Sequence, residues 1–187
     1  MTTLIAQFAA PLARDRRLAT VSVTGFVVAL AAASQIAVPI PGTPVPITLQ
    51  PLIVVLAGMM LGPALGATSM LLYLAIGAAG LPVFAPVGLP GIARFAGPTG
   101  GYLIAYPVAA AVAGILARRF PTLLGRWMAA RVGIATLFVG GLSWLAVLNG
   151  SASRAIVLGL TPFALLDVVK AFIAASIARP RVRSARD

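Results

Sequence analysis

The chain has 187 residues, of which 60% are hydrophobic and 9% charged, and its formal net charge is +11. This composition excludes an ordinary soluble domain and favours a bundle of membrane-spanning helices, because lipid leaves backbone polar groups no partners outside the chain. The sequence has no Cys, His or Glu, which excludes the usual metal sites and His-based catalysis, and its single lysine, Lys170, lacks the preceding glycine of a Walker A loop.

The first predicted span covers about residues 18–38 and follows Arg14, Arg16 and Arg17. Such a beginning is similar to a secretory signal peptide. However, the apolar stretch is longer than the hydrophobic region of a signal peptide, and further spans follow it. We interpret it as a retained first helix.

The next apolar run is too long for one crossing, and Gly62-Pro63 divides it, because proline disfavours a helical conformation in the residue before it. A Gly- and Pro-rich stretch over 80–97 is predicted to be a long loop. The later spans are expected at about 51–61, 64–79, 101–117, 127–148 and 155–178. The sequence thus predicts an all-α membrane protein, a single membrane domain over 1–187, with six transmembrane helices.

Basic residues predict the orientation of these helices, since cytoplasmic loops carry an excess of Lys and Arg. An even number of crossings puts both termini on the same side of the membrane. If that side is the cytoplasm, only Arg94 and Arg154 lie outside. The same arrangement collects the following residues inside: Arg14, Arg16, Arg17, Arg118, Arg119, Arg126, Arg179, Arg181, Arg183 and Arg186. We expect a multi-pass protein of the cytoplasmic (inner) membrane, and no nucleic-acid partner for the positive charge.

Asp167 and Lys170 lie three residues apart within the last apolar run, one turn beyond Pro162, which can kink that span. A charged side chain near the bilayer centre costs about 2.5–3.5 kcal/mol on insertion scales, so such residues are rare and usually functional. Residues at this spacing share one helical face, where they can contact each other and a common ligand. Either an interior ion pair or a ligand site explains them.

Two polar segments are predicted near the outer end of the bundle. Thr48 and Gln50 close the Pro-rich loop at a helix entrance, where Thr48 can act as an N-cap with Pro51 in the first turn, or can bind a ligand. The segment 97–102, which contains Thr99, brings glycine N–H groups to the start of a helix just after Arg94. It can form a tight turn or an anion site.

Small residues recur at every fourth position of the first span, including Ala29 and Ala33. Such a stripe lets another helix approach closely, either within the chain or from a partner. Aromatic residues gather near the outer end of the predicted bundle, as an interface belt or as the walls of an apolar pocket: Tyr73, Phe84, Phe95, Tyr102 and Tyr106.

Taken in order, these motifs resemble those of BioY, the biotin-binding membrane component of energy-coupling-factor transporters. The resemblance covers about residues 18–178. The residues that carry it are Pro44-Val45-Pro46-Ile47-Thr48-Leu49-Gln50, Ala57-Gly58, Leu61-Gly62-Pro63, Tyr73-Leu74, Gly80-Leu81-Pro82-Val83-Phe84, Gly97-Pro98-Thr99-Gly100-Gly101-Tyr102 and the Asp167/Lys170 pair.

The resemblance implies a six-helix capture subunit whose ligand is covered by the loop between the first two helices. It implies a transmembrane coupling subunit and two ATP-binding subunits as partners, with no cofactor, no metal and no catalysis in this chain itself. A homo-oligomer remains open. In the family the stripe on the first helix docks the coupling subunit, which would make Ala29 and Ala33 a partner surface.

Biotin chemistry suits these residues. Its ureido ring needs an acceptor and a donor, roles that Asp167 and Lys170 can fill while each compensates the charge of the other. Arg94 is the expected partner of the carboxylate tail, with Thr48, Gln50 and Thr99 as further polar contacts. The walls around the sulfur ring are expected from Tyr73, Phe84 and Phe95.

The sequence also admits two other functions. A self-sufficient proton-coupled vitamin carrier would use Asp167 and Lys170 for proton exchange, although the chain shows no internal duplication of the kind common in carriers. A membrane enzyme is disfavoured because few catalytic residue types are present. Biotin binding to the purified chain is the observation that best separates these possibilities.

Overall fold

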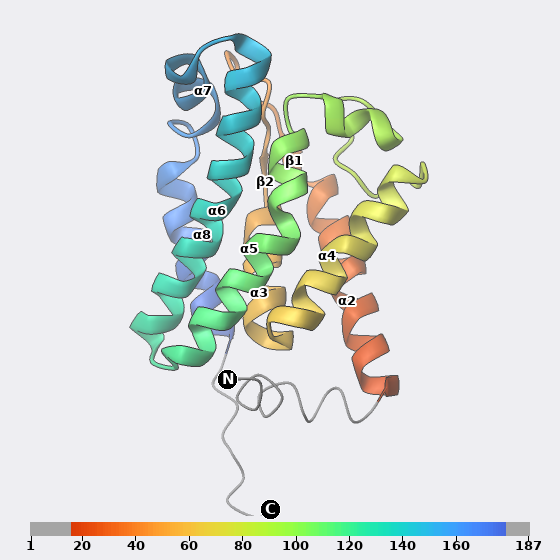
Figure 1. Ribbon diagram of the computed structural model, residues 1–187, viewed down its shortest axis with the longest axis vertical. Helices are drawn as coiled ribbons and strands as arrows, with labels where there is room; N and C mark the ends of the chain where they lie inside the picture. Colours follow the sequence, from red (N-terminus) through yellow and green to blue (C-terminus); the bar gives the residue numbers. More distant parts are fainter. Residues whose placement is uncertain (1–15, 179–187) are drawn as a thin grey trace, which may run out of the picture.

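The structure is a computed structural model that describes residues 16–178, and it is mostly helical (Figure 1). Its helices pack side by side, with a short antiparallel strand pair at one end of the bundle. In chain order the elements are α2 (Arg16–Gln35), β1 (Ala37–Val38), β2 (Ile47–Thr48), α3 (Gln50–Leu61), α4 (Pro63–Ala78), the 3-10 helix η1 (Gly91–Ala96), α5 (Gly100–Arg119), α6 (Leu123–Asn149), α7 (Ala152–Gly159) and α8 (Ala164–Ile177).

Helices α3, α5 and α6 form the centre of the bundle and approach one another closely. Gly58 of α3 lies against Ala110 of α5, where an added Cβ would overlap the Ala110 carbonyl oxygen. Gly101 of α5 meets the Gly140 carbonyl of α6 in the same manner. Small residues at such contacts allow van der Waals packing between helices that the hydrophobic effect cannot drive together in lipid.

The first helix ends earlier than the sequence predicts. It ends at Gln35, and Ala37 and Val38 form a strand that pairs with Thr48 and Ile47. The predicted Pro-rich loop is therefore closed at its base by an antiparallel ladder. The predicted loop over 80–97 likewise contains the short helix η1 near its end.

The last predicted span, over 155–178, is divided near the kink expected at Pro162 into two helices. Helices α7 and α8 are separated by a short break and bent by 56° with respect to each other. The break contains Pro162, which lacks a backbone N–H and disfavours a helical conformation in Thr161. Asp167 and Lys170 consequently lie in the first two turns of a new helix.

Three helices in the described part of the chain, α2, α5 and α6, are long and apolar enough to cross a membrane, and the bent pair α7–α8 can form a fourth span. Helices α3 and α4 are apolar but shorter, with 12 and 16 residues. Large hydrophobic side chains such as Val139 and Leu165 are exposed at 69% and 79%. An outer surface of this kind suits a lipid environment.

Basic residues gather at one end of the bundle, where α2 and α6 begin and α5 ends (Figure 1). The other end carries the strand pair, η1 and α7, and with them Arg94 and Arg154. Five arginines named in the topology prediction lie outside the described residues: Arg14, Arg179, Arg181, Arg183 and Arg186.

Candidate binding cavity

A cavity lies at the end of the bundle that carries the strand pair. It is enclosed by the first turns of α3, α5 and α8, the middle of α6, the end of α7, and the loops that include β2 and η1. Its polar lining comprises Thr48, Gln50, Arg94, Thr99, Asp167 and Lys170. Its aromatic lining comprises Phe84, Tyr102, Tyr106, Phe138 and Phe163. Seven of the nine residues expected to bind a ligand thus line one cavity.

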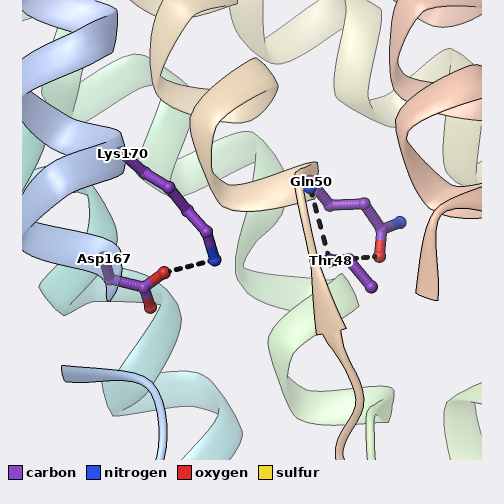
Figure 2. Close-up of polar contacts among 4 residues, drawn as sticks. All are labelled: Thr48, Gln50, Asp167 and Lys170. Carbon is purple, nitrogen blue, oxygen red and sulfur yellow. Dashed lines mark hydrogen bonds and ion pairs between the residues drawn. The ribbon is translucent and has the colours of Figure 1, made fainter. Parts of the chain in front are cut away.

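Asp167 and Lys170 form a buried ion pair at the wall contributed by α8. The Lys170 ammonium donates to Asp167 Oδ1 over 2.7 Å, and both residues are buried. Figure 2 shows the two side chains extending from α8 toward the segment that carries Thr48 and Gln50. The pair is therefore both charge-compensated and exposed to the cavity, so the ion-pair and ligand-site interpretations describe the same residues.

Gln50 lies on the opposite wall with its side chain amide held at both ends. Thr48 Oγ1 donates to Gln50 Oε1 over 3.2 Å and accepts from the Gln50 backbone N–H over 3.3 Å. Gln50 Nε2 donates to Tyr73 OH over 3.0 Å. The N-cap of α3 is Leu49 and not Thr48, although Thr48 still satisfies an N–H of the first turn beside Pro51.

Tyr73 does not line the cavity, contrary to its predicted role as a wall. It is fully buried on α4 behind the lining, where its hydroxyl contacts Gln50 and donates to the Val83 carbonyl over 2.9 Å. Phe95 is also behind the lining and packs edge-to-face on Phe84, with ring centroids 6.0 Å apart. Both residues therefore lie one layer behind the cavity wall to which the prediction assigned them.

Arg94 lines the cavity and is buried, which is unusual for a positively charged side chain. Its guanidinium donates to the carbonyl oxygens of Ala85 and Val87, and it lies over the Phe84 ring at 5.9 Å. Arg94 Nε has no hydrogen-bond partner within the described residues. Burial lowers the pKa of Arg94 from its usual value. Arg94 thus holds the loop that contains Ala85 and Val87 in position, and it places a positive charge at the cavity.

Tyr102 and Tyr106 form the α5 side of the cavity, although the sequence left them undecided between an interface belt and a pocket wall. They occur four residues apart and so share one helix face. Tyr102 OH donates to the Gly159 carbonyl over 2.8 Å at the end of α7. Phe163 and Phe138 were not predicted, since nothing in their local sequence distinguishes them from packing residues.

The loop between β1 and β2 lies against α6 and α7. Val45 packs in a cluster with Leu145, Ala155 and Phe163. Thr43 Oγ1 donates to the Leu158 carbonyl over 2.6 Å and accepts from the Val45 N–H over 3.1 Å. Since Val45 and Pro46 also line the cavity, this loop closes one side of it.

The small-residue stripe of α2 passes from the surface into the core. An added Cβ at Gly25 would meet nothing within 4 Å, Ala29 is half-buried, and Ala33 is buried at 6% exposure. Internal packing thus accounts for Ala33, while the part around Gly25 and Ala29 is accessible.

Comparison with known proteins identifies relatives over most of the chain. The family model described as "BioY family" matches residues 5–187. A protein of Pyrococcus horikoshii named "Probable biotin transporter BioY" is 43% identical over 153 residues, covering 82% of this chain and 89% of that protein. The "Biotin transporter BioY" of Rhizobium etli is 34% identical over 145 residues, covering 73% of this chain and 77% of that protein.

A solved structure supports the same relationship. The crystal structure of "the S-component for biotin from an ECF-type ABC transporter" superposes with a TM-score of 0.81 at 26% identity, covering 88% of this chain and 90% of the other. Family match, sequence identity and fold therefore agree over nearly the whole length. The chain belongs to the BioY family.

Proposed function

We propose that this chain binds biotin in the described cavity and serves as the substrate-capture subunit of an energy-coupling-factor transporter in the cell membrane. The observation that carries the proposal is the buried Asp167–Lys170 pair, which faces a largely aromatic cavity. The relatives named as biotin transporters and the similarity to a biotin S-component support it. These comparisons do not favour the proton-coupled carrier.

The ureido ring of biotin is proposed to lie against the ion pair. Its N–H groups would donate to the Asp167 carboxylate, and its carbonyl would accept from the Lys170 ammonium. Because the two charges already compensate each other at 2.7 Å, the empty site does not carry an uncompensated buried charge. Hydrogen bonds to charged groups contribute about 1.5–3 kcal/mol each, so these contacts would orient the ureido ring and add to the affinity that burial of the sulfur ring supplies.

The carboxylate tail of biotin is proposed to point toward Arg94 and Thr99. Both residues line the cavity, and the unpartnered Arg94 Nε offers an additional N–H donor. Phe84, Tyr102 and Tyr106 would enclose the sulfur ring between them, while Gln50 completes the polar wall opposite the ion pair. Phe95 and Tyr73 would act by supporting Phe84 and Gln50.

A six-crossing arrangement with both termini in the cytoplasm is supported by the gathering of basic residues at one end of the bundle. Helices α3 and α4 would each cross as short spans, and α7 with α8 would make the sixth crossing. This topology places the cavity near the outer face, because the cavity and the arginine-rich end lie at opposite ends (Figure 1).

ATP hydrolysis is assigned to separate subunits, because the sequence has no phosphate-binding loop around its single lysine. A transmembrane coupling subunit and two ATP-binding subunits would supply it. The accessible part of the α2 stripe, with Ala29 at its centre, is the proposed docking surface for the coupling subunit.

The test is direct binding of radiolabelled biotin to the purified chain, with desthiobiotin as competitor. Saturable binding at submicromolar ligand is the expected result. No binding at micromolar biotin would remove the proposal. Uptake in cells that lack a coupling subunit and ATPase, abolished by a protonophore, would instead support a self-sufficient carrier.

A further inference from the structure

The segment 82–87 forms part of the cavity wall although it belongs to no helix or strand. It contributes Phe84 and Ala85 to the lining. A segment without regular structure must satisfy its backbone carbonyls elsewhere, and inside a membrane protein water is a poor partner. Side chains from other elements donate to the carbonyl oxygens of five of its residues: Pro82, Val83, Phe84, Ala85 and Val87.

Two of these side chains belong to the end of α2. Ser34 is fully buried, and its Oγ, which carries one proton, lies 2.6 Å from the Val83 carbonyl oxygen and 2.7 Å from the Ala31 carbonyl oxygen of its own helix. Gln35 Nε2 reaches the Phe84 carbonyl at 3.2 Å, the Pro82 carbonyl at 3.4 Å and Ser34 Oγ at 2.9 Å. Neither residue lines the cavity, so both contact its wall only from behind.

Tyr73 reaches the same carbonyl from α4. Its hydroxyl donates to Val83 O over 2.9 Å and accepts from Gln50 Nε2 over 3.0 Å. Its ring contacts Phe84 edge-to-face, with centroids 5.5 Å apart. The Val83 carbonyl therefore joins α2 and α4, and through Tyr73 it is linked to Gln50, which also lines the cavity.

We propose that Ser34 and Tyr73 are positioning residues for ligand binding: their hydroxyls jointly fix the Val83 carbonyl and thereby set Phe84 and Gln50 in the cavity. This inference rests on the proposed biotin-binding function. It assigns a role to a polar residue of α2 that is remote from the ion pair. It also gives Tyr73 a role other than contact with the ligand.

The test compares biotin dissociation constants of Ser34→Ala, Tyr73→Phe and the double variant, each of which removes only hydroxyl groups. One hydroxyl remains on Val83 O in each single variant, so we expect binding weaker by roughly two- to tenfold, the range of one hydrogen bond. The double variant removes both hydroxyls from a carbonyl behind the cavity wall. We expect its loss to exceed the product of the two single losses.

Ser69→Ala is the matched control. Ser69 is as buried as Ser34, but its Oγ donates to Leu65 O within its own helix over 2.8 Å. It should lower the melting temperature by an amount similar to Ser34→Ala while leaving biotin affinity unchanged. A purely structural role for Ser34 would give the same pattern, a changed melting temperature with an unchanged dissociation constant, and would overturn the inference.

The two proposals fail in different ways. If the wild type and Ser69→Ala do not bind biotin, the proposed function is wrong. If they bind and the double variant binds equally well, only the positioning role is wrong. Should the double variant not fold, the two single variants decide, because each removes one hydroxyl from the Val83 carbonyl. Binding that is unchanged in both single variants would contradict the inference.

Discussion

Lys170 Nζ lies 2.7 Å from Asp167 Oδ1 at the wall of a cavity that is otherwise mostly aromatic. Both residues lie in the first two turns of α8, which begins at Ala164 after the break that contains Pro162. Their side chains point into the cavity from one face of this helix. Asp167 is in the first turn of α8, where the positive end of the helix dipole favours its charge. The location thus stabilises charges that lipid would oppose.

Replacing either member of the pair should reduce both biotin affinity and stability. Asp167→Asn leaves Lys170 as an uncompensated buried cation, and Lys170→Met leaves the carboxylate unpaired; each should weaken biotin binding about tenfold to a hundredfold. The double variant Asp167→Asn/Lys170→Met should regain melting temperature without regaining affinity. Recovery of binding together with stability would show that the pair is structural only.

The sequence predicted the bundle better than it predicted its interruptions. Hydropathy and the Gly62-Pro63 division located α3 and α4 to within two residues, because apolar runs and proline act locally. Pro162 predicted a kink in the last span, but the end of one helix and the start of another were not predicted, since the apolar run continues through the break. Only the geometry of the backbone around Pro162 distinguishes a kink from two helices.

The cavity was also predicted only in part. The position of Asp167, Lys170 and Arg94 at the cavity was predictable, because charged residues are rare in apolar membrane segments and usually have a functional role. Tyr73 and Phe95 were placed in the lining because a sequence cannot separate a side chain that lines a cavity from one packed behind it. That difference depends on tertiary contacts with Gln50 and Phe84.

Arg94 should determine the preference for a charged ligand tail. Wild-type protein is expected to bind biotin at least tenfold more tightly than biotin methyl ester, because the ester removes the negative charge that Arg94 faces. Arg94→Gln should reduce this preference toward one by weakening biotin more than the ester. Arg154→Gln, which removes an exposed cation on the same side, should preserve it. Competition binding with the two ligands measures the ratio, and an unchanged ratio in Arg94→Gln would assign the tail elsewhere.

Thr43 should control how long the ligand remains bound. Its hydroxyl joins the β1–β2 loop to the Leu158 carbonyl at the end of α7, and Val45 of the same loop lines the cavity. Thr43→Val keeps the side-chain shape but removes that bond, so biotin should dissociate roughly two- to tenfold faster. Thr136→Val is the control, because Thr136 donates only to Val132 within its own helix. Equal dissociation rates in a chase experiment would show that the loop is held by apolar packing alone.

Gly58 should tolerate no side chain, whereas Gly25 should. An added Cβ at Gly58 overlaps the Ala110 backbone carbonyl, which cannot move without separating α3 from α5. Gly58→Ala is expected to lower the melting temperature strongly or to prevent folding. Gly25→Ala meets nothing within 4 Å and adds a residue of higher helix propensity, so its melting temperature should be unchanged or slightly higher. A stable Gly58→Ala variant would show that the central packing is looser than described.

Ala29 should separate biotin capture from uptake. Ala29→Trp places a bulky side chain on the accessible part of the α2 stripe, away from the cavity, and should abolish uptake in cells that contain the coupling and ATP-binding subunits. Binding of biotin by the isolated chain should be unchanged. Val28→Trp is a matched control, because Val28 is 61% exposed on an adjacent face of the same helix and should tolerate the ring in lipid. If both variants lose uptake equally, α2 is sensitive to bulk in general; if neither does, the coupling subunit docks on another helix.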